Sequence, residues 1–146
     1  MNDSEPTEVD RWLGPELYSS DRPELTLEGS KCRECSAVTF PRQDSCPRCA
    51  GLDVAPHPLA REGSIWAVTV QRFAPKPPYL CPPDEFRPYA VAYVDLGGEV
   101  LVEGRVSMAD GQTLRIGQPV RLVAESLVDH AGELWQLFAF EPSGDA

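Results

Sequence analysis

Four cysteines form two close pairs, Cys32-x-x-Cys35 and Cys46-x-x-Cys49, and a short segment separates the pairs. A CxxC turn directs two sulfurs at one centre, so the two turns together supply the four ligands of a tetrahedral zinc site. Four thiolates fill every position around the ion and leave none for water. The spacing therefore predicts a structural zinc and not a catalytic one.

Two other uses of these cysteines stay open. Disulfides or redox-active CxxC motifs are disfavoured, because the sequence shows no secretory signal and a redox CxxC normally follows a strand in a thioredoxin-like βαβ unit. Iron in a rubredoxin-like site is an alternative to zinc. Basic residues near the cysteines would offset the negative charge of four thiolates around one divalent ion; they are Lys31, Arg33, Arg42 and Arg48.

The size and composition of the chain limit what surrounds this site. A length of 146 residues allows one domain or two small ones. Between the cysteine pairs there are too few apolar residues for a core, so the metal must supply much of the folding energy there. Residues 1–8 form an acidic, polar tail without the apolar segment of a signal peptide, and no run approaches the roughly 18 apolar residues of a membrane span. We expect a soluble, cytoplasmic protein.

The charge balance opposes one common role of small zinc and β-barrel proteins. The chain has 13 basic and 23 acidic residues and a formal net charge of −10. Nucleic-acid binding takes much of its affinity from Lys and Arg side chains that neutralise phosphates. We therefore expect no nucleic-acid partner, although a local basic patch near the cysteines keeps this function as an alternative.

Two apolar segments lie outside the regular pattern of the chain. Residues 9–20 place apolar side chains roughly at helical spacing, interrupted by Gly14-Pro15, and predict a short or broken helix that docks on a partner or on this chain. Residues 74–88 hold six of the fifteen prolines, which excludes them from a sheet and predicts a stiff arm that contacts a partner or covers the barrel. The candidate aromatic anchors of the two segments are Trp12, Tyr18, Tyr79 and Phe86.

The rest of the chain predicts a zinc ribbon followed by a barrel. Five runs of β-branched, aromatic and other apolar residues follow the ribbon, separated by turn residues, with no helical run between them. A closed antiparallel barrel is favoured, and five is the strand number of the OB-fold. The expected domains are residues 1–28 for the tail and helix, 29–56 for the ribbon and 57–146 for the OB-fold. The five predicted strands are residues 64–73, 89–96, 99–106, 119–127 and 134–140.

An active site is not evident in the sequence. His57 lies between two prolines and His130 lies in a polar turn, where a lone histidine is usually a surface residue. Cys81 has no histidine or helix N-terminus nearby in sequence to lower its pKa. The neighbouring carboxylates Asp84 and Glu85 should point apart. We expect no catalytic residue and no activity of the isolated chain.

Several motifs together resemble the DUF35 family, whose members pair an N-terminal helix and a rubredoxin-like zinc ribbon with an acyl-CoA-associated OB-fold. The resemblance spans roughly residues 9–142. The chain departs from the family pattern at Trp66, where tyrosine is common, and at Ser36, where glycine is frequent. The motifs are Leu27-Glu28-Gly29-Ser30-Lys31-Cys32-x-x-Cys35, Phe40-Pro41-Arg42, Cys46-Pro47-x-Cys49, Gly63-Ser64-Ile65-Trp66, Arg87-Pro88-Tyr89 and Ile116-Gly117-Gln118-Pro119-Val120.

The resemblance implies a non-catalytic accessory subunit that stabilises a thiolase-like enzyme, a thiolase or an aldolase of lipid or steroid degradation, and shapes its acyl-CoA site. Such subunits typically flank a central thiolase dimer in a heterotetramer. A MaoC-like enoyl-CoA hydratase is the alternative partner; thiolase is favoured because the chain ends soon after the barrel, without a fused hydratase domain. A CoA thioester at the interface would need cations for its phosphates. The candidates are Arg33, Arg42, Arg48 and Lys76.

Overall fold

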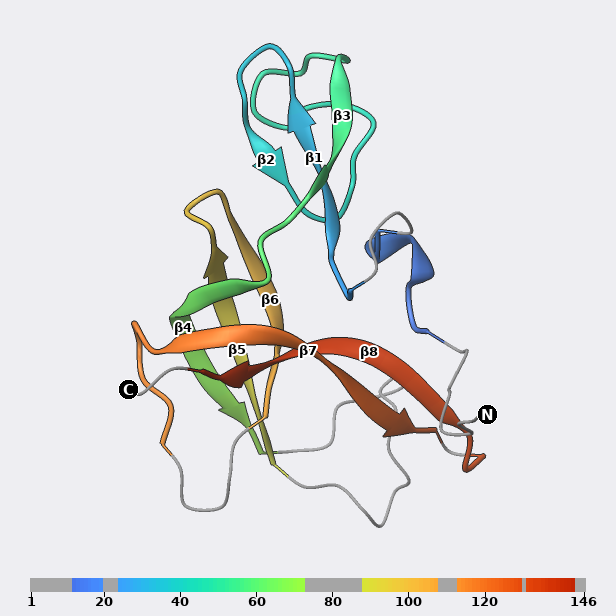
Figure 1. Ribbon diagram of the computed structural model, residues 1–146, viewed down its shortest axis with the longest axis vertical. Helices are drawn as coiled ribbons and strands as arrows, with labels where there is room; N and C mark the ends of the chain where they lie inside the picture. Colours follow the sequence, from blue (N-terminus) through green and yellow to red (C-terminus); the bar gives the residue numbers. More distant parts are fainter. Residues whose placement is uncertain (1–11, 20–23, 73–87, 108–112, 130, 144–146) are drawn as a thin grey trace.

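The computed structural model of this chain describes residues 12–19, 24–72, 88–107, 113–129 and 131–143. A three-stranded sheet stands on a closed five-stranded barrel (Figure 1). The described residues contain one helical turn and no longer helix. The mainly β fold with a zinc-ribbon-like cysteine cluster and a five-stranded barrel is therefore confirmed.

The small sheet forms the ribbon. It consists of β1 (Glu28–Cys32) between β2 (Val38–Thr39) and β3 (Val54–Pro58), both antiparallel to β1. A Cβ on Gly29 would run into the backbone carbonyl oxygen of Thr39, so this position needs glycine. The predicted domain boundary at residues 56/57 falls inside β3, and the division into domains stays a prediction.

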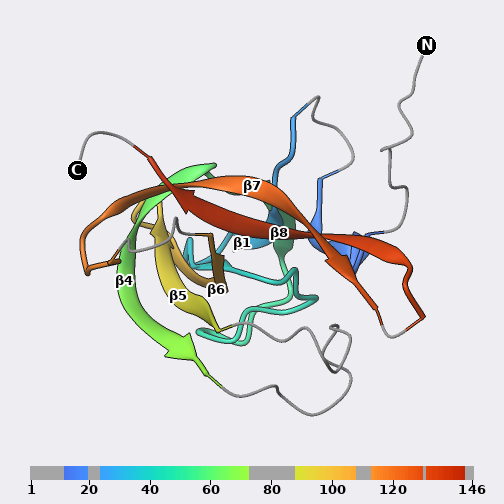
Figure 2. The same ribbon diagram turned by 90° about the horizontal axis from the view of Figure 1, so that it is seen from below.

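The barrel strands agree with the five predicted runs. They are β4 (Glu62–Gln71), β5 (Tyr89–Leu96), β6 (Val100–Val106), β7 (Pro119–Val128) and β8 (Leu134–Pro142). The order around the barrel is β4-β5-β6-β8-β7, and β7 pairs again with β4 to close it. All pairs are antiparallel except a parallel contact between β6 and β8. Seen from below, β7 and β8 arch over one side while β4, β5 and β6 curve around the other (Figure 2).

A period of two in the strands builds the barrel core. On β5, Ala90, Ala92, Val94 and Leu96 are buried, while the intervening residues face outward. Gly104 on β6 lets two rings lie on the backbone, since a Cβ there would come within 3.0 Å of both Phe138 and Phe140. The inner faces therefore fill the barrel with apolar side chains.

The barrel core continues into the base of the ribbon. Leu27 and Leu59 are buried in the same apolar cluster as the barrel residues, and the Leu59 N–H donates to the Leu27 carbonyl at 2.9 Å. Arg61 donates through Nε to the Leu25 carbonyl at 2.7 Å, and its own carbonyl accepts the N–H of Leu122 on β7 at 2.8 Å. These bonds fix the base of the ribbon on the barrel.

The predicted N-terminal helix is wrong. Within residues 12–19, the described part of this segment, only one 3₁₀ turn forms, η1 (Pro15–Leu17). Gly14 has φ 62°, outside the helical region, and Pro15 lacks an N–H and disfavours a helical residue before it. The flanking residues form isolated bridges instead: Trp12 bridges Gln136 of β8, where the Leu13 N–H donates to the Gln136 carbonyl at 2.8 Å, and Tyr18 bridges Leu27, the residue before β1.

The proline-rich arm at residues 74–88 lies outside the described residues except for Pro88. Among the helices of the described part of the chain, none is long and apolar enough to cross a membrane.

Candidate metal centre

The two CxxC turns are built in the same way at the tip of the ribbon. In the first, the Cys32 N–H donates to the Ala37 carbonyl and the Ser36 N–H to the Cys32 carbonyl, both at 2.9 Å. In the second, the Cys46 N–H donates to the Gly51 carbonyl at 2.9 Å and the Ala50 N–H to the Cys46 carbonyl at 2.8 Å. The residue after each second cysteine is left-handed, with φ 68° at Ser36 and 65° at Ala50. Two equivalent loops therefore face each other.

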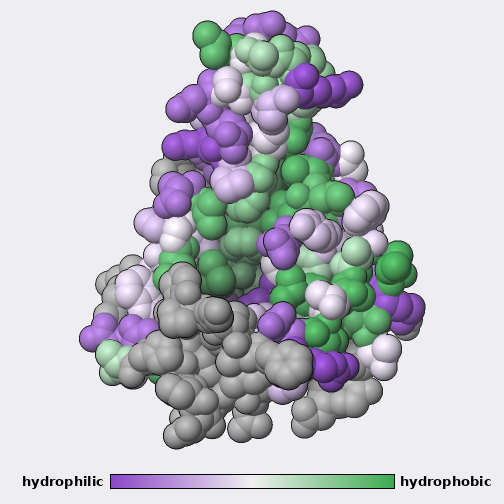
Figure 3. All heavy atoms as spheres, turned by 180° about the vertical axis from the view of Figure 1, so that it is seen from behind, coloured by the Kyte–Doolittle hydropathy of each residue, from purple (hydrophilic) through white to green (hydrophobic). Residues whose placement is uncertain are grey.

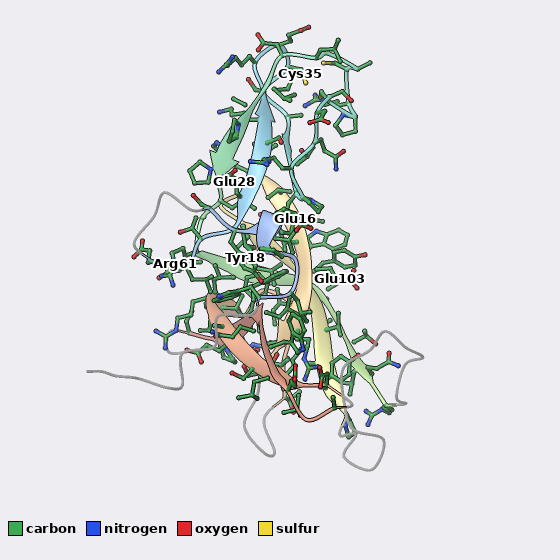
Figure 4. All side chains as sticks on the ribbon, turned by 90° about the vertical axis from the view of Figure 1, so that its right-hand side faces the viewer. Glu16, Tyr18, Glu28, Cys35, Arg61 and Glu103 are labelled. Carbon is green, nitrogen blue, oxygen red and sulfur yellow. The ribbon has the colours of Figure 1, made fainter. Side chains whose placement is uncertain are left out.

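Hydrogen bonds tie both loops to the small sheet. The buried Ser30 of β1 accepts the Gln43 N–H at 2.8 Å and lies 3.2 Å from the Gln43 carbonyl, which anchors the segment between the pairs. The Arg33 N–H donates to the Asp53 carbonyl at 2.8 Å, just before β3 begins. The sheet thus holds both loops at one end, where Figure 4 shows Cys35 far from the barrel.

The four sulfurs converge on a point. Cys32 Sγ lies 3.7 Å from Cys49 Sγ, and Cys35 Sγ lies 3.6 Å from Cys46 Sγ. All four sulfurs lie within 4.8 Å of one another. Zinc–sulfur bonds of about 2.3 Å place the sulfurs of a regular tetrahedron about 3.8 Å apart. The cluster therefore has the size of a four-thiolate metal site.

Backbone N–H groups are already turned towards the sulfurs. Cys32 Sγ accepts from the N–H of Glu34 at 3.3 Å and of Cys35 at 3.4 Å, and Cys46 Sγ accepts from the N–H of Arg48 at 3.4 Å. Such bonds favour the thiolate over the thiol. They provide the polar surroundings that sulfurs bonded to a metal require.

The thiols of the metal-free cluster cannot all ionise together. The N–H of Cys49 is the main cause that lowers the pKa of Cys46 to about 7. The N–H of Gly51 also acts to lower the pKa of Cys49, but the neighbouring thiols and burial outweigh it and raise that pKa to about 12. A divalent cation removes this conflict, because its charge stabilises every thiolate at once.

Arg33 and Arg42 pair with carboxylates at opposite ends of β1. Arg33 lies 3.0 Å from Asp53 and Arg42 lies 2.6 Å from Glu28, so each has its own carboxylate. Glu28 and Cys32 are the two ends of β1, which places Arg42 at the base of the ribbon and Arg33 at its tip. The side chain of Arg48 belongs to the second CxxC turn, and Lys76 lies outside the described residues.

The remaining polar candidates are not brought together. His57 lies on β3, where Nε2 is 3.1 Å from Oε1 of Glu99 in the β5–β6 turn, so it links the ribbon to the barrel. The other candidates fall outside the described residues; they are His130, Cys81, Asp84 and Glu85.

The two described aromatic anchors pack on this chain. Tyr18 contacts the ring of Trp12 at 4.8 Å and that of Phe138 at 6.4 Å between centroids. Its hydroxyl oxygen accepts the Phe138 N–H at 2.9 Å. Phe40 from the ribbon contacts Phe138 at 6.0 Å, so Phe138 joins three parts of the chain. Tyr79 and Phe86 lie outside the described residues.

Sequence reasoning missed a group of exposed apolar residues on the barrel. Trp66, Tyr93 and Leu101 are exposed although they lie within three adjacent strands. The alternation on β5 was a usable signal for Tyr93, since the small or aliphatic residues Ala90, Ala92 and Val94 must face inward. No comparable signal marks Trp66, because an irregularity in the pairing lies between Ile65 and Ala67.

The chain matches two family profiles in succession. Residues 20–55 match the "ChsH2, rubredoxin-like zinc ribbon domain" and residues 56–125 the "ChsH2, C-terminal OB-fold domain". It is 24% identical over 104 residues to "Benzoylsuccinyl-CoA thiolase subunit BbsA" of Thauera aromatica, which covers 71% of this chain and 67% of that protein.

Two archaeal relatives and a solved structure agree with these profiles. A "DUF35 domain-containing scaffold protein" of Methanothermobacter thermautotrophicus is 29% identical over 122 residues, 80% of this chain and 86% of that one. A protein of the same description from Methanocaldococcus jannaschii is 26% identical over 98 residues, 66% of each chain. The solved structure "Ltp2-ChsH2(DUF35) aldolase" shares the fold, with a TM-score of 0.56 and 23% identity over 80% of this chain and 84% of that one. The chain therefore belongs to the DUF35 family.

Proposed function

We propose that this chain is a zinc-binding, non-catalytic subunit that assembles with a thiolase-like enzyme acting on acyl-CoA thioesters. Cys32, Cys35, Cys46 and Cys49 hold a structural zinc in this proposal. The subunit stabilises its partner and helps to shape the partner's substrate site. Reduced cysteines in a metal site suit a reducing compartment, so the proposal places the complex in the cytoplasm.

One observation carries the non-catalytic part of the proposal. The four sulfurs lie within 4.8 Å of one another, and a metal bound by four thiolates has no position left for substrate or water. His57, a histidine within the described residues, has Glu99 as its side-chain partner at 3.1 Å. The chain contributes a rigid metal-stabilised body and leaves the chemistry to its partner.

The names of the relatives support the partner class. One is called a subunit of a CoA thiolase, and the solved neighbour is called an aldolase that contains a DUF35 chain. A CoA thioester at the interface is part of the same proposal. The candidate cations for its phosphates are Arg33, Arg42, Arg48 and Lys76; Arg33 and Arg42 would have to exchange the carboxylates that they now contact.

The proposal is tested by purifying the full chain with a C-terminal tag from its own cells. We expect native mass spectrometry to show a complex with a thiolase-like protein and one zinc per chain of the subunit. The thiolase-like protein should lose stability or activity when the subunit is withheld and recover it when the subunit is added back. A chain that purifies alone and changes no acyl-CoA enzyme would contradict the proposal, and a hydratase in the complex would correct the partner class.

A scaffold role is the second candidate. The two archaeal relatives are described as scaffold proteins, and one of them covers most of this chain. A scaffold holds two different enzymes, whereas an accessory subunit holds one. The subunit composition of the purified complex separates the two functions.

A further inference from the structure

Three large apolar side chains lie exposed on neighbouring barrel strands. The exposed fractions are 58% for Trp66 on β4, 45% for Tyr93 on β5 and 40% for Leu101 on β6. Side chains of this kind usually avoid water, and a contiguous group of them marks a binding surface. We call these three residues the outer strip.

The strand register places the three residues side by side. Tyr93 lies opposite Ala67, the residue next to Trp66, on one side and opposite Glu103 on the other. Leu101 lies two positions from Glu103 on β6, so it is the diagonal neighbour of Tyr93, a distance of about 7–8 Å that an aromatic side chain can bridge. Seen from behind, apolar surface gathers over this side of the barrel and reaches the base of the ribbon (Figure 3).

The charges around the outer strip are negative. Glu103 is exposed on this face and Asp95 lies on the same side of β5, and Figure 4 shows Glu103 on the outside of the barrel. Arg105 is the one cation within β4, β5 and β6, and it already lies 3.1 Å from Glu125 and over the ring of Tyr89 at 4.2 Å. No free positive charge within these strands offsets the carboxylates.

The position of the strip within the fold explains why it should bind something. In a five-stranded barrel of this topology, the outer face of the second and third strands is the surface on which oligonucleotide ligands are bound. Those strands are β5 and β6 here. Nucleic-acid binders combine aromatic side chains with Lys and Arg on this face. Here aromatic side chains are combined with carboxylates, which repel phosphates.

The same charges select the occupant. A second copy of this chain would bring its own carboxylates against Asp95 and Glu103, and like charges across an interface cost affinity. The complementary surface is a protein patch with an apolar centre and a rim of Lys and Arg. We propose that the outer strip is the docking face for the thiolase-like partner, with Trp66 and Tyr93 as its anchors. This inference rests on the proposed function.

Binding variants of the full chain test this face. The probe is the thiolase-like protein that co-purifies with the wild-type chain, and the measurement is its Kd and association rate by interferometry. Trp66→Thr/Tyr93→Thr should weaken binding at least about 30-fold, since anchor aromatic residues dominate interface energies. Threonine keeps the β propensity of the strands. Glu103→Lys should slow association and flatten its salt dependence without disturbing the fold.

A matched pair of leucines provides the control. Leu101 and Leu134 are exposed to 40% and 42%, but Leu134 lies on β8, outside the strip. Leu101→Thr should weaken binding clearly more than Leu134→Thr. Thermal unfolding and zinc content show whether each variant is folded. If Trp66→Thr/Tyr93→Thr does not fold, the association rate of Glu103→Lys still tests whether the partner docks on this face.

The outcomes separate this inference from the proposed function. If the partner binds the wild type and all strip variants equally, the docking face is wrong while the proposed function stands. If no thiolase-like protein binds the wild type, both the docking face and the proposed function are wrong. Binding of a labelled single-stranded oligonucleotide that depends on Tyr93 would overturn the inference in favour of nucleic acid. A dimer of the isolated chain that dissociates with Tyr93→Thr would assign the face to a second copy.

Discussion

The ribbon and the barrel are both small β structures, but they are held together by different forces. The barrel buries apolar side chains from all five strands, among them Ile65, Val102, Leu122 and Phe140. The far end of the ribbon buries little besides Cys32 and Cys46, and β2 has two residues. Removal of water from apolar surface therefore stabilises the barrel, whereas metal–sulfur bonds must stabilise the ribbon tip. The two meet at Phe138, where ring contacts connect them.

Loss of a metal ligand should cause the largest difference in stability between the ribbon and the barrel. Cys46→Ser removes one thiolate from a site of a kind whose zinc binding contributes about 10–16 kcal/mol in isolated zinc fingers. We expect amides of residues 32–54 to lose protection from hydrogen exchange while the barrel amides keep theirs. Cys81→Ser is the control, because Cys81 is not one of the four clustered cysteines; this variant should keep the zinc content of the wild type. Equal loss of protection in the barrel would show that the metal supports the whole fold.

Removal of the ring that joins the regions should affect both. Phe138→Ala leaves a cavity among Tyr18, Phe40 and Phe140, and Phe→Ala changes in cores cost about 3–5 kcal/mol. Chemical denaturation should show a lower stability of the barrel, and hydrogen exchange should show a looser ribbon base with the metal still bound. Leu122→Ala in the barrel core is the control; it should destabilise the barrel with less effect on residues 25–40.

The N-terminal segment provides a weaker test of the same junction. Tyr18→Phe keeps the ring but removes the oxygen that accepts the Phe138 N–H. An N–H left without a partner in a buried position costs about 1–3 kcal/mol. Denaturation midpoints of the variant and the wild type measure this cost. Identical midpoints would mean that water replaces the hydroxyl.

Alkaline pH should weaken the junction through the same hydroxyl. Burial raises the pKa of Tyr18 from 10.0 to about 12, with the Phe138 N–H opposing the shift. The fold favours the protonated phenol, so this contribution is complete below pH 10 and is lost as the pH rises through 12. Ultraviolet titration should show one tyrosine ionising late in the wild type, and this late transition should be missing from Tyr18→Phe. A late transition that persists in the variant would assign it to another tyrosine.

The smallest effect should come from the turns of the metal site. Ser36 has φ 68°, where glycine is free of the strain of a Cβ. Ser36→Gly should therefore stabilise the zinc-bound ribbon by up to about 1 kcal/mol. Ala50→Gly in the equivalent turn is the matched variant and should behave alike. Zinc retention against a competing chelator measures both, and a loss of zinc retention would mean that chain flexibility outweighs strain.

Much of this fold could be predicted from particular residues. The four cysteines could be predicted to lie close together, because two CxxC turns can bind one ion only if they face each other. They are Cys32, Cys35, Cys46 and Cys49. The predicted strands 89–96 and 99–106 correspond to β5 and β6, and the two glycines near their junction, Gly97 and Gly98, have the positive φ that a tight hairpin turn requires. Local patterns of this kind act over a few residues, so they are visible in the sequence.

The sequence-based predictions failed where contacts with other parts of the chain determine the local structure. At residues 9–20, apolar spacing suggested a helix, but within the described residues 12–19 only the turn η1 forms, and Trp12 and Tyr18 pair with Gln136 and Leu27 instead. The outer strip was missed for a related reason. The sequence shows that Tyr93 alternates with inward residues, but only barrel closure shows that nothing in the described chain covers it.

The bridge between Trp12 and Gln136 has a consequence for the order of events during synthesis. The ribbon sheet is complete once residue 58 has left the ribosome, and with its metal it can fold at once. The barrel needs β8, and Trp12 and Leu13 must wait for Gln136, a strand residue made more than a hundred residues later. Pairings over such a separation fold slowly. The metal-bound ribbon should therefore be able to fold before Trp12 finds its partner on β8.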